Sequence, residues 1–287
     1  LFCLYRHLPD IKLRFFVIAL LLCASMFPYY LNRYDGEVLT ATTVSLGFLY
    51  LLNNRMVLGG VLLTIGIAQT PAAFPAFLLA TCFYVYKTKK LKLLILIIFP
   101  LIIIVGENLM KYDSLLNNPY LAGNKGVATI MPYSGLPGFS YPFYLGFLSI
   151  VFSFGKGLIF FIPAIFLRFF INLKDHADQK IIVFIDTLLI FLWGLVLTYS
   201  KWWAWYGGGS WGPRFFLIGC IPAALILALG LIKKEKSLKA LIIYLGVLVL
   251  SAWVCIQGFL YNNHKLELCF QNNYAYEFMC WYIPEFS

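Results

Sequence analysis

The stretch Ser200-Lys-Trp-Trp-Ala-Trp-Tyr-Gly-Gly-Gly-Ser-Trp-Gly-Pro-Arg214 lies between two long apolar runs. It contains four of the seven tryptophans and the three consecutive glycines Gly207 to Gly209. Glycine leaves backbone N–H groups unobstructed and tolerates φ > 0, so such a run is suited to cradle an anion. Arg214 adds a planar donor fork that fits a phosphate. Tryptophans also gather where membrane helices meet headgroups, so the stretch is equally typical of a loop between two spans.

The composition identifies a polytopic membrane protein. Of the 287 residues, 62% are hydrophobic and 12% are charged, and the mean hydropathy is +0.84, whereas a soluble domain carries about 25% charge. The apolar runs are continuous and do not alternate with period two, which predicts helices and not a β-barrel. We therefore expect an all-α bundle of about eight to nine spans or re-entrant segments over residues 1–260.

The basic residues predict the sidedness of these spans. The net charge is +10, and the cations cluster in short loops between apolar runs, which indicates topology determinants and not a nucleic acid partner. Positive loops mark the cytoplasmic side. If the apolar run that begins at Phe15 crosses outward, the clusters 87–92 and 233–239 both fall inside.

The same orientation places three polar or short segments on the outer side. They are a long loop at residues 107–141, an interfacial or re-entrant segment at 143–157, and a polar tail at 261–287. The tail holds Cys269 and Cys280, and an oxidising exterior would let a disulfide between them persist. The other cysteines lie singly in or beside apolar runs and are expected to pack as small hydrophobic residues.

The predicted outer face also gathers the polar groups that could carry chemistry. Lys156, Lys201 and Arg214 are placed to meet the phosphate of a lipid headgroup. Asp35 and Glu37 are the only close pair of carboxylates on that face. Such a pair can supply a general base and its partner, or it can solvate a short loop and balance a neighbouring arginine, which is the more common role.

Several classes of function are disfavoured by the sequence. It contains no Walker loop, no dinucleotide-binding glycine fingerprint and no Gly-x-Ser-x-Gly elbow. His7 and His176 fall on the predicted inner side and His264 on the outer, so they form no metal site. Asp186 lies inside a span, where acids are functional candidates, but near its cytoplasmic end, within reach of Lys180 or the headgroups.

Two motifs resemble those of bacterial membrane glycosyltransferases of the GT-C superfamily, which include the protein mannosyltransferases and aminoarabinose transferases. The stretch from Lys201 to Arg214 resembles their Trp-x-x-Trp-x-Gly-Gly-x-x-x-Gly-Pro-Arg signature. The stretch from Gly146 to Pro163 resembles their Gly-Leu-Leu-Phe-Ser-Pro-Gly-Arg-Gly-Leu-Phe-x-x-x-Pro element, with Phe and Lys at 154 and 156 in place of Pro and Arg. A weaker third match begins at Glu37-Val-Leu, and the resemblance spans roughly residues 30 to 230.

The resemblance implies transfer of a sugar from a polyprenyl-phosphate donor, with inversion, on the outer side of the bacterial inner membrane. The lipid phosphate gathers negative charge as the glycosidic bond breaks, so fixed cations stabilise the transition state more than the ground state. The residues expected to hold that phosphate are Lys156, Lys201, Arg214, Gly207, Gly208 and Gly209. The residues expected to stack on sugar or isoprenoid are Trp203, Trp205 and Trp211.

The catalytic base has two interpretations. Either Asp35 and Glu37 are the first-loop acids of the superfamily, or Glu37 belongs to a later helix and the base precedes Leu1 in a longer chain; we favour the second. The superfamily allows a divalent metal ion, and nothing in this chain demands one. Two other functions stay open: a non-catalytic subunit of a membrane complex, which a missing acid would fit, and a flippase or transporter of a lipid-linked sugar, which the apolar spans disfavour.

Overall fold

The computed structural model describes residues 8, 10–112, 138–170, 173, 177–232, 238–260 and 280–282, and every regular element in them is a helix. The predicted all-α class is therefore confirmed. Four helical stretches are long and apolar enough to cross a membrane: Leu91–Tyr112, Gln179–Tyr199, Arg214–Ile232 and Leu238–Leu260. Two bent pairs of helices pass the same test together. The described residues thus provide four candidate spans, or six if each bent pair is one span, and the predicted eight to nine are not all found.

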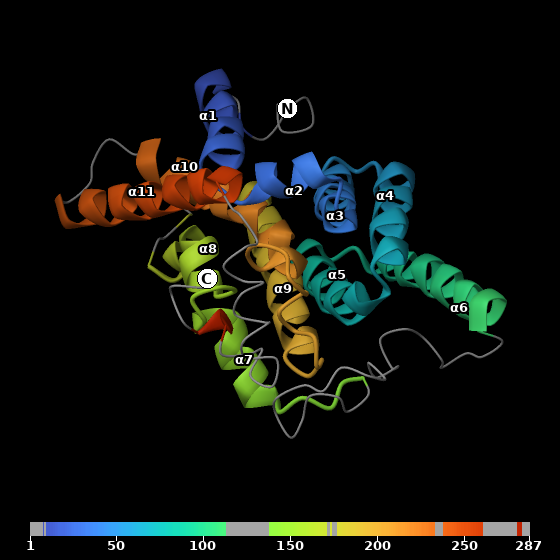
Figure 1. The fold of residues 1–287 in the computed structure, drawn as a ribbon. Coiled ribbons are helices and arrows are strands. Elements are labelled where there is room, and N and C mark those ends of the chain that lie inside the picture. Colours follow the sequence, from blue (N-terminus) through green and yellow to red (C-terminus); the bar gives the residue numbers. More distant parts are fainter. Residues whose placement is uncertain are drawn as a thin grey trace.

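Short breaks separate most of the helices, and longer segments follow α6 and α9 (Figure 1). In chain order they are α1 (Ile11–Cys23), α2 (Phe27–Arg33), α3 (Gly36–Leu52), α4 (Met56–Gln69), η2 (Pro71–Ala73), α5 (Phe74–Thr88), η3 (Leu91–Ile97), α6 (Ile98–Tyr112), α7 (Phe143–Phe152), α8 (Leu158–Phe161), η4 (Pro163–Phe169), α9 (Gln179–Tyr199), η6 (Arg214–Gly219), α10 (Cys220–Ile232) and α11 (Leu238–Leu260). The elements labelled η are 3₁₀ turns. η3 runs on into α6, and η6 runs on into α10.

Helix length explains why fewer spans are found than predicted. A helix rises 1.5 Å per residue, so the 17 residues of α3 cover roughly 26 Å of a hydrocarbon core about 30 Å thick. The ten residues of α7 cover roughly half of it, in keeping with the short segment predicted at 143–157. Helix α6 continues to Tyr112, so the predicted loop 107–141 starts later than expected. Most of that loop, and most of the tail 261–287, lie outside the described residues.

Proline positions explain both bent pairs. α1 and α2 meet at 67°, and α4 meets the Pro71–Thr88 stretch at 118°. A proline stands in the first turn of α2 and of both helical elements after Thr70. Because proline lacks an N–H and clashes with the preceding turn, it begins helices and ends the one before it. The break predicted at Thr70-Pro71 is therefore present.

Helices α9 and α10 form the centre of the bundle, and most of their residues are buried. The α6 and α11 stretches are mostly exposed, although they are equally apolar. Helices α3 and α4 pack especially closely: a Cβ built on Gly59 would lie 2.9 Å from the carbonyl oxygen of Gly47. Small residues let two membrane helices approach in this way. The apolar, exposed faces of α6 and α11 are those expected to meet lipid.

Candidate functional site

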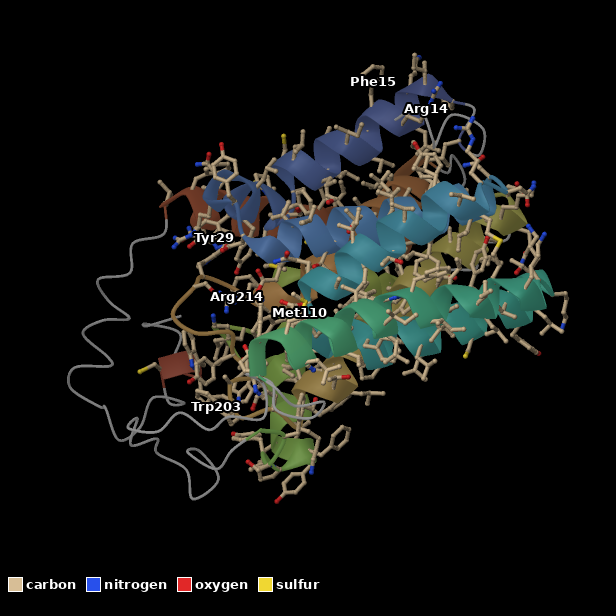
Figure 2. All side chains as sticks on the ribbon, turned by 90° about the vertical axis from the view of Figure 1, so that its right-hand side faces the viewer. Arg14, Phe15, Tyr29, Met110, Trp203 and Arg214 are labelled. Atoms are coloured by element: carbon tan, nitrogen blue, oxygen red, sulfur yellow. The ribbon has the colours of Figure 1, made fainter. Side chains whose placement is uncertain are left out.

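Residues 200–213, between α9 and η6, form the Trp–Gly loop. Three of its glycines have positive φ, in the left-handed region: 75° at Gly207, 74° at Gly208 and 69° at Gly212. A residue with a Cβ is strained in this region by roughly 1–2 kcal/mol. Backbone conformation thus explains Gly207, Gly208 and Gly212 of the motif. The loop, Tyr29 and Arg214 lie at the opposite end of the molecule from Arg14 at the start of α1 (Figure 2).

Lys156, in the turn between α7 and α8, anchors the Trp–Gly loop. Its side chain is 1% exposed, and its Nζ donates to the carbonyl oxygens of Gly208 at 3.2 Å, Gly212 at 3.0 Å and Ser210. An ammonium group has three N–H donors, so these carbonyls occupy all of them. Lys156 therefore holds the loop in this structure and has no donor left for the lipid phosphate that was predicted for it.

A short piece of the C-terminal region covers the same ammonium group. The ring of Trp281 lies 4.3 Å from the Lys156 Nζ, in cation–π geometry, and stacks on Tyr206 with centroids 5.7 Å apart. The Gly155 N–H donates to the Trp281 carbonyl at 3.0 Å. Burial raises the pKa of the neighbouring Tyr282 phenol, which contacts the Ser149 hydroxyl. The loop and the chain terminus thus form one packed unit, a contact that sequence reasoning missed.

Arg214 and Glu37 come together at the edge of the Trp–Gly loop. The Nε of Arg214 lies 3.4 Å from a carboxylate oxygen of Glu37, and both side chains are partly exposed. The guanidinium also lies 5.0 Å from the ring centroid of Phe215. Glu37 stands in the first turn of α3 and Arg214 opens η6. The structure therefore joins two candidates that are 177 residues apart in the sequence.

The outer nitrogens of Arg214 make no hydrogen bond to any residue that the structure describes. Its ε nitrogen faces Glu37, so the two terminal amino groups are available as a donor fork. Gly207 lies against the Arg214 side chain, because a Cβ at this glycine would come within 3.1 Å of the Arg214 Cγ. A bare backbone at this position therefore lets the arginine lie against the loop. The Gly207 N–H donates to the Ala204 carbonyl oxygen at 2.9 Å, so the candidate donors for an anion at this edge of the loop are the Arg214 fork and the N–H groups of Gly208 and Gly209.

Next to this pair is a small cavity. Its walls include Glu37, Thr40, Thr70, Tyr199 and Phe215, and its volume is about 10 Å³. A cavity of that size has room for about one water molecule. The Thr40 and Thr70 hydroxyls are hydrogen-bonded to each other at 2.8 Å. In this conformation the cavity does not have room for a sugar.

The remaining predicted site residues occupy different environments. Asp35 is the residue before α3 and is half-buried, and Lys201 is exposed at the end of α9. Trp203 is half-buried, whereas Trp205 and Trp211 are 2% and 6% exposed. The buried rings contact protein, so in this structure only Trp203 of the three keeps a partly open face. Gly209 is exposed at the tip of the loop.

Tyr30 is a supporting residue that sequence reasoning did not single out. It is fully buried in α2, and its hydroxyl donates to the carbonyl oxygens of Trp211 and, at 3.3 Å, Gly212. It lies in an apolar helix without a motif, so nothing in the local sequence indicated this role. Tyr30 and Lys156 therefore hold the glycine end of the loop from two sides.

Asp186, the acid inside α9, has a partner. Its two carboxylate oxygens accept from the Arg168 Nε at 2.8 Å and from a terminal nitrogen at 3.1 Å. A bidentate pair of this kind satisfies both charges. Neither Lys180 nor a headgroup is needed to explain the acid, and its role here is to join η4 to α9.

The described residues contain no group of three or more His, Cys, Asp or Glu side chains that could hold a metal ion. Cys280 is disulfide-bonded. Cys269, its predicted partner, lies outside the described residues, as do His7, His176 and His264.

Comparisons with models of protein families, with curated proteins and with solved structures found no match for this chain.

Proposed function

We propose that the chain is a membrane glycosyltransferase of the GT-C type, which moves a sugar from a polyprenyl-phosphate donor to an acceptor on the outer side of the membrane. The observation that carries the proposal is the Arg214–Glu37 pair at the edge of the Trp–Gly loop. It brings together a guanidinium group that can bind a phosphate and a carboxylate that can accept a proton. The motif resemblance supplies the substrate class.

In the proposed reaction an acceptor hydroxyl oxygen attacks the anomeric carbon of the donor sugar. The bond from that carbon to the phosphate oxygen breaks, and the phosphate leaves with the electron pair. The hydroxyl proton passes to a carboxylate, for which Glu37 is the better placed candidate and Asp35 the second. The terminal nitrogens of Arg214 donate hydrogen bonds to the phosphate as negative charge builds on it. This lowers the barrier to the extent that the phosphate is bound more tightly in the transition state than in the ground state.

The phosphate set differs from the one expected from sequence. Arg214, the exposed Lys201 and the backbone of Gly208 and Gly209 stay in it. The Gly207 N–H is donated to the Ala204 carbonyl, and Lys156 holds the loop through its carbonyls. Trp203 is the candidate for contact with sugar or isoprenoid. Because the cavity beside Glu37 holds about one water, the loop or the segments around it must move to admit a sugar.

The test is binding of a polyprenyl phosphate to the purified chain in lipid nanodiscs. A charge-assisted hydrogen bond to an anion contributes about 1.5–3 kcal/mol, so Arg214→Ala should weaken binding roughly 10- to 100-fold. Lys239→Ala is the control, because Lys239 is an exposed cation on α11 outside the site, and it should bind as the parent does. Equal affinity in the parent and Arg214→Ala would refute the phosphate site.

Catalysis is tested separately by transfer from a polyprenyl-phosphate sugar. Glu37→Gln keeps the shape of the side chain but removes its basicity, so it should abolish transfer and keep phosphate binding. Asp35→Asn serves as the comparison, since it removes the other acid. If both variants keep full transfer activity, the base is neither residue.

A second candidate function is a non-catalytic subunit that binds a lipid phosphate or a partner protein. The small volume of the cavity beside Glu37 favours it, because this cavity leaves no room for a sugar in this conformation. A subunit would bind polyprenyl phosphate in an Arg214-dependent manner. It would show no sugar transfer, so Glu37→Gln would have no activity to remove.

A further inference from the structure

An apolar groove lies on the outside of the bundle, between α4 and the continuous η3–α6 helix. Its volume is about 660 Å³, within the range of small-molecule and lipid sites. It is lined by Met56, Val57, Gly60, Val61, Thr64, Ile65, Ile95, Leu96, Phe99, Ile102 and Ile103. Val57 and Ile102 are 81% and 62% exposed, so the groove opens toward the surroundings of the bundle.

One end of the groove is strongly cationic. Arg55 directly precedes Met56, the first groove residue of α4, and is exposed. Lys92 is also exposed and stands three residues before Ile95 in the 3₁₀ helix η3, where residues i and i+3 share a face. Lys90 contacts Asn54 across the gap between the two helices. Cations from both walls therefore meet at the same mouth.

These cations have no acidic neighbours to balance them. The sequence contains no Asp or Glu between Glu37 and Glu107. Lys87 and Lys89 reinforce the cluster, and each lies over an aromatic ring of α5. In the described part of the chain, none of these five basic side chains forms an ion pair. An apolar slot that ends at unbalanced cations matches one chemistry, an acyl chain joined to an anionic headgroup.

The groove is separate from the Arg214 site. Its cationic mouth is at the start of α4, whereas the far end of α4 leads to the Glu37 site: a Cβ on Gly36 would lie 2.6 Å from the Gln69 side chain. Positive clusters mark the cytoplasmic side of a membrane protein, and anionic lipids enrich that leaflet. The mouth would then lie at the level of those headgroups.

We propose that this groove binds an anionic membrane phospholipid, with an acyl chain between α4 and α6 and the headgroup phosphate at Arg55, Lys90 and Lys92. Lipid tails are as apolar as the groove walls, so the chain by itself adds little selectivity over the bilayer. The headgroup charge is what distinguishes this lipid from others. The site is independent of the proposed transfer reaction.

The experiment uses the full chain in detergent with equal amounts of phosphatidylglycerol and phosphatidylcholine, and native mass spectrometry counts the lipids that stay bound. The parent should retain phosphatidylglycerol preferentially. Each basic residue near the membrane surface contributes roughly fivefold, so Arg55→Gln with Lys92→Gln should reduce the preference about 25-fold. Lys239→Gln, an exposed cation on α11, is the matched charge control and should keep it.

A second variant tests the groove itself. Val61→Trp fills it from a half-exposed position and should release phosphatidylglycerol, whereas Val249→Trp on the exposed face of α11 should not. Equal retention of both lipids by the parent would overturn the proposal. So would an equal loss of phosphatidylglycerol in the control variants Lys239→Gln and Val249→Trp. Displacement by polyprenyl phosphate that depends on Arg214 and not on Arg55 would assign the groove to the donor instead. A lipid-free dimer that Val61→Trp breaks would assign it to a second copy of the chain.

Discussion

The buried charge of Lys156 is the most constrained single feature of the site. Its ammonium group is held by three carbonyl oxygens of the Trp–Gly loop and by the ring of Trp281. A buried cation is tolerated only with such partners. Three of its partners are carbonyl oxygens of the Trp–Gly loop, which lose this donor if the lysine is replaced.

We predict that Lys156→Met destabilises the protein by about 3–5 kcal/mol, because the methionine fills the space but leaves the loop carbonyls without donors. The measurement is thermal unfolding in detergent, followed by tryptophan fluorescence. Lys201→Met is the control, since Lys201 is exposed, and it should change the midpoint little. A Lys156→Met protein as stable as its parent would contradict the anchoring role.

Two neighbouring glycines separate backbone strain from placement of the arginine. Gly207 and Gly208 have nearly the same φ, so alanine costs roughly 1–2 kcal/mol at either. A Cβ at 207 would also press on the Arg214 side chain, whereas one at 208 meets nothing within 4 Å. We predict that both variants lose stability, Gly207→Ala at least as much as Gly208→Ala, and that only Gly207→Ala binds polyprenyl phosphate more weakly. Equal binding by the two variants would show that Arg214 does not depend on the bare backbone.

At the scale of elements, the α3–α4 pair depends on contact between backbones. A Cβ on Gly59 would lie 2.9 Å from a backbone oxygen of α3, which no rotamer change can relieve. We predict that Gly59→Ala destabilises by about 1–3 kcal/mol, as overpacking does. Gly246→Ala on α11 is the matched control: nothing lies within 4 Å of its Cβ, and alanine is the better helix former. Unfolding midpoints of the two variants should therefore move in opposite directions or differ clearly.

Individual elements were predictable in kind more than in length. The break at Thr70-Pro71 and the short segment around α7 followed from proline chemistry and run length. The end of α6 did not, because Glu107 and Lys111 look like loop residues in sequence but contact each other one helical turn apart. A polar residue at the end of a helix is predicted as part of a loop unless its partner four residues away on the same helix is recognised.

At the scale of the whole molecule, the sidedness of the chain is open to a direct test. Tyr34, which is 93% exposed, lies three residues before Glu37, the partner of Arg214, and Lys201 belongs to the Trp–Gly loop. Arg55 follows the opposite end of α3, and Lys92 lies two residues from Lys90, which contacts Asn54 there. We predict that cysteines at 34 and 201 react with an impermeant thiol reagent from outside the cell, and cysteines at 55 and 92 only after the membrane is opened. The parent chain, with its native cysteines, gives the background. Reaction of positions 34 and 92 from the same side would contradict the two-ended arrangement.

The sequence by itself determined the class of this protein, because hydropathy and charge are sums over many residues and do not depend on which helix packs where. It also indicated the Trp–Gly loop as the candidate site, because a run of glycines permits backbone conformations that other residues avoid. The tertiary structure decided which candidates meet. Glu37 reached Arg214, whereas Lys156, a phosphate ligand by motif, was buried under Trp281 at the far end of the chain. Exposure and partnership are set by residues distant in sequence, so no local pattern could have distinguished the two cations.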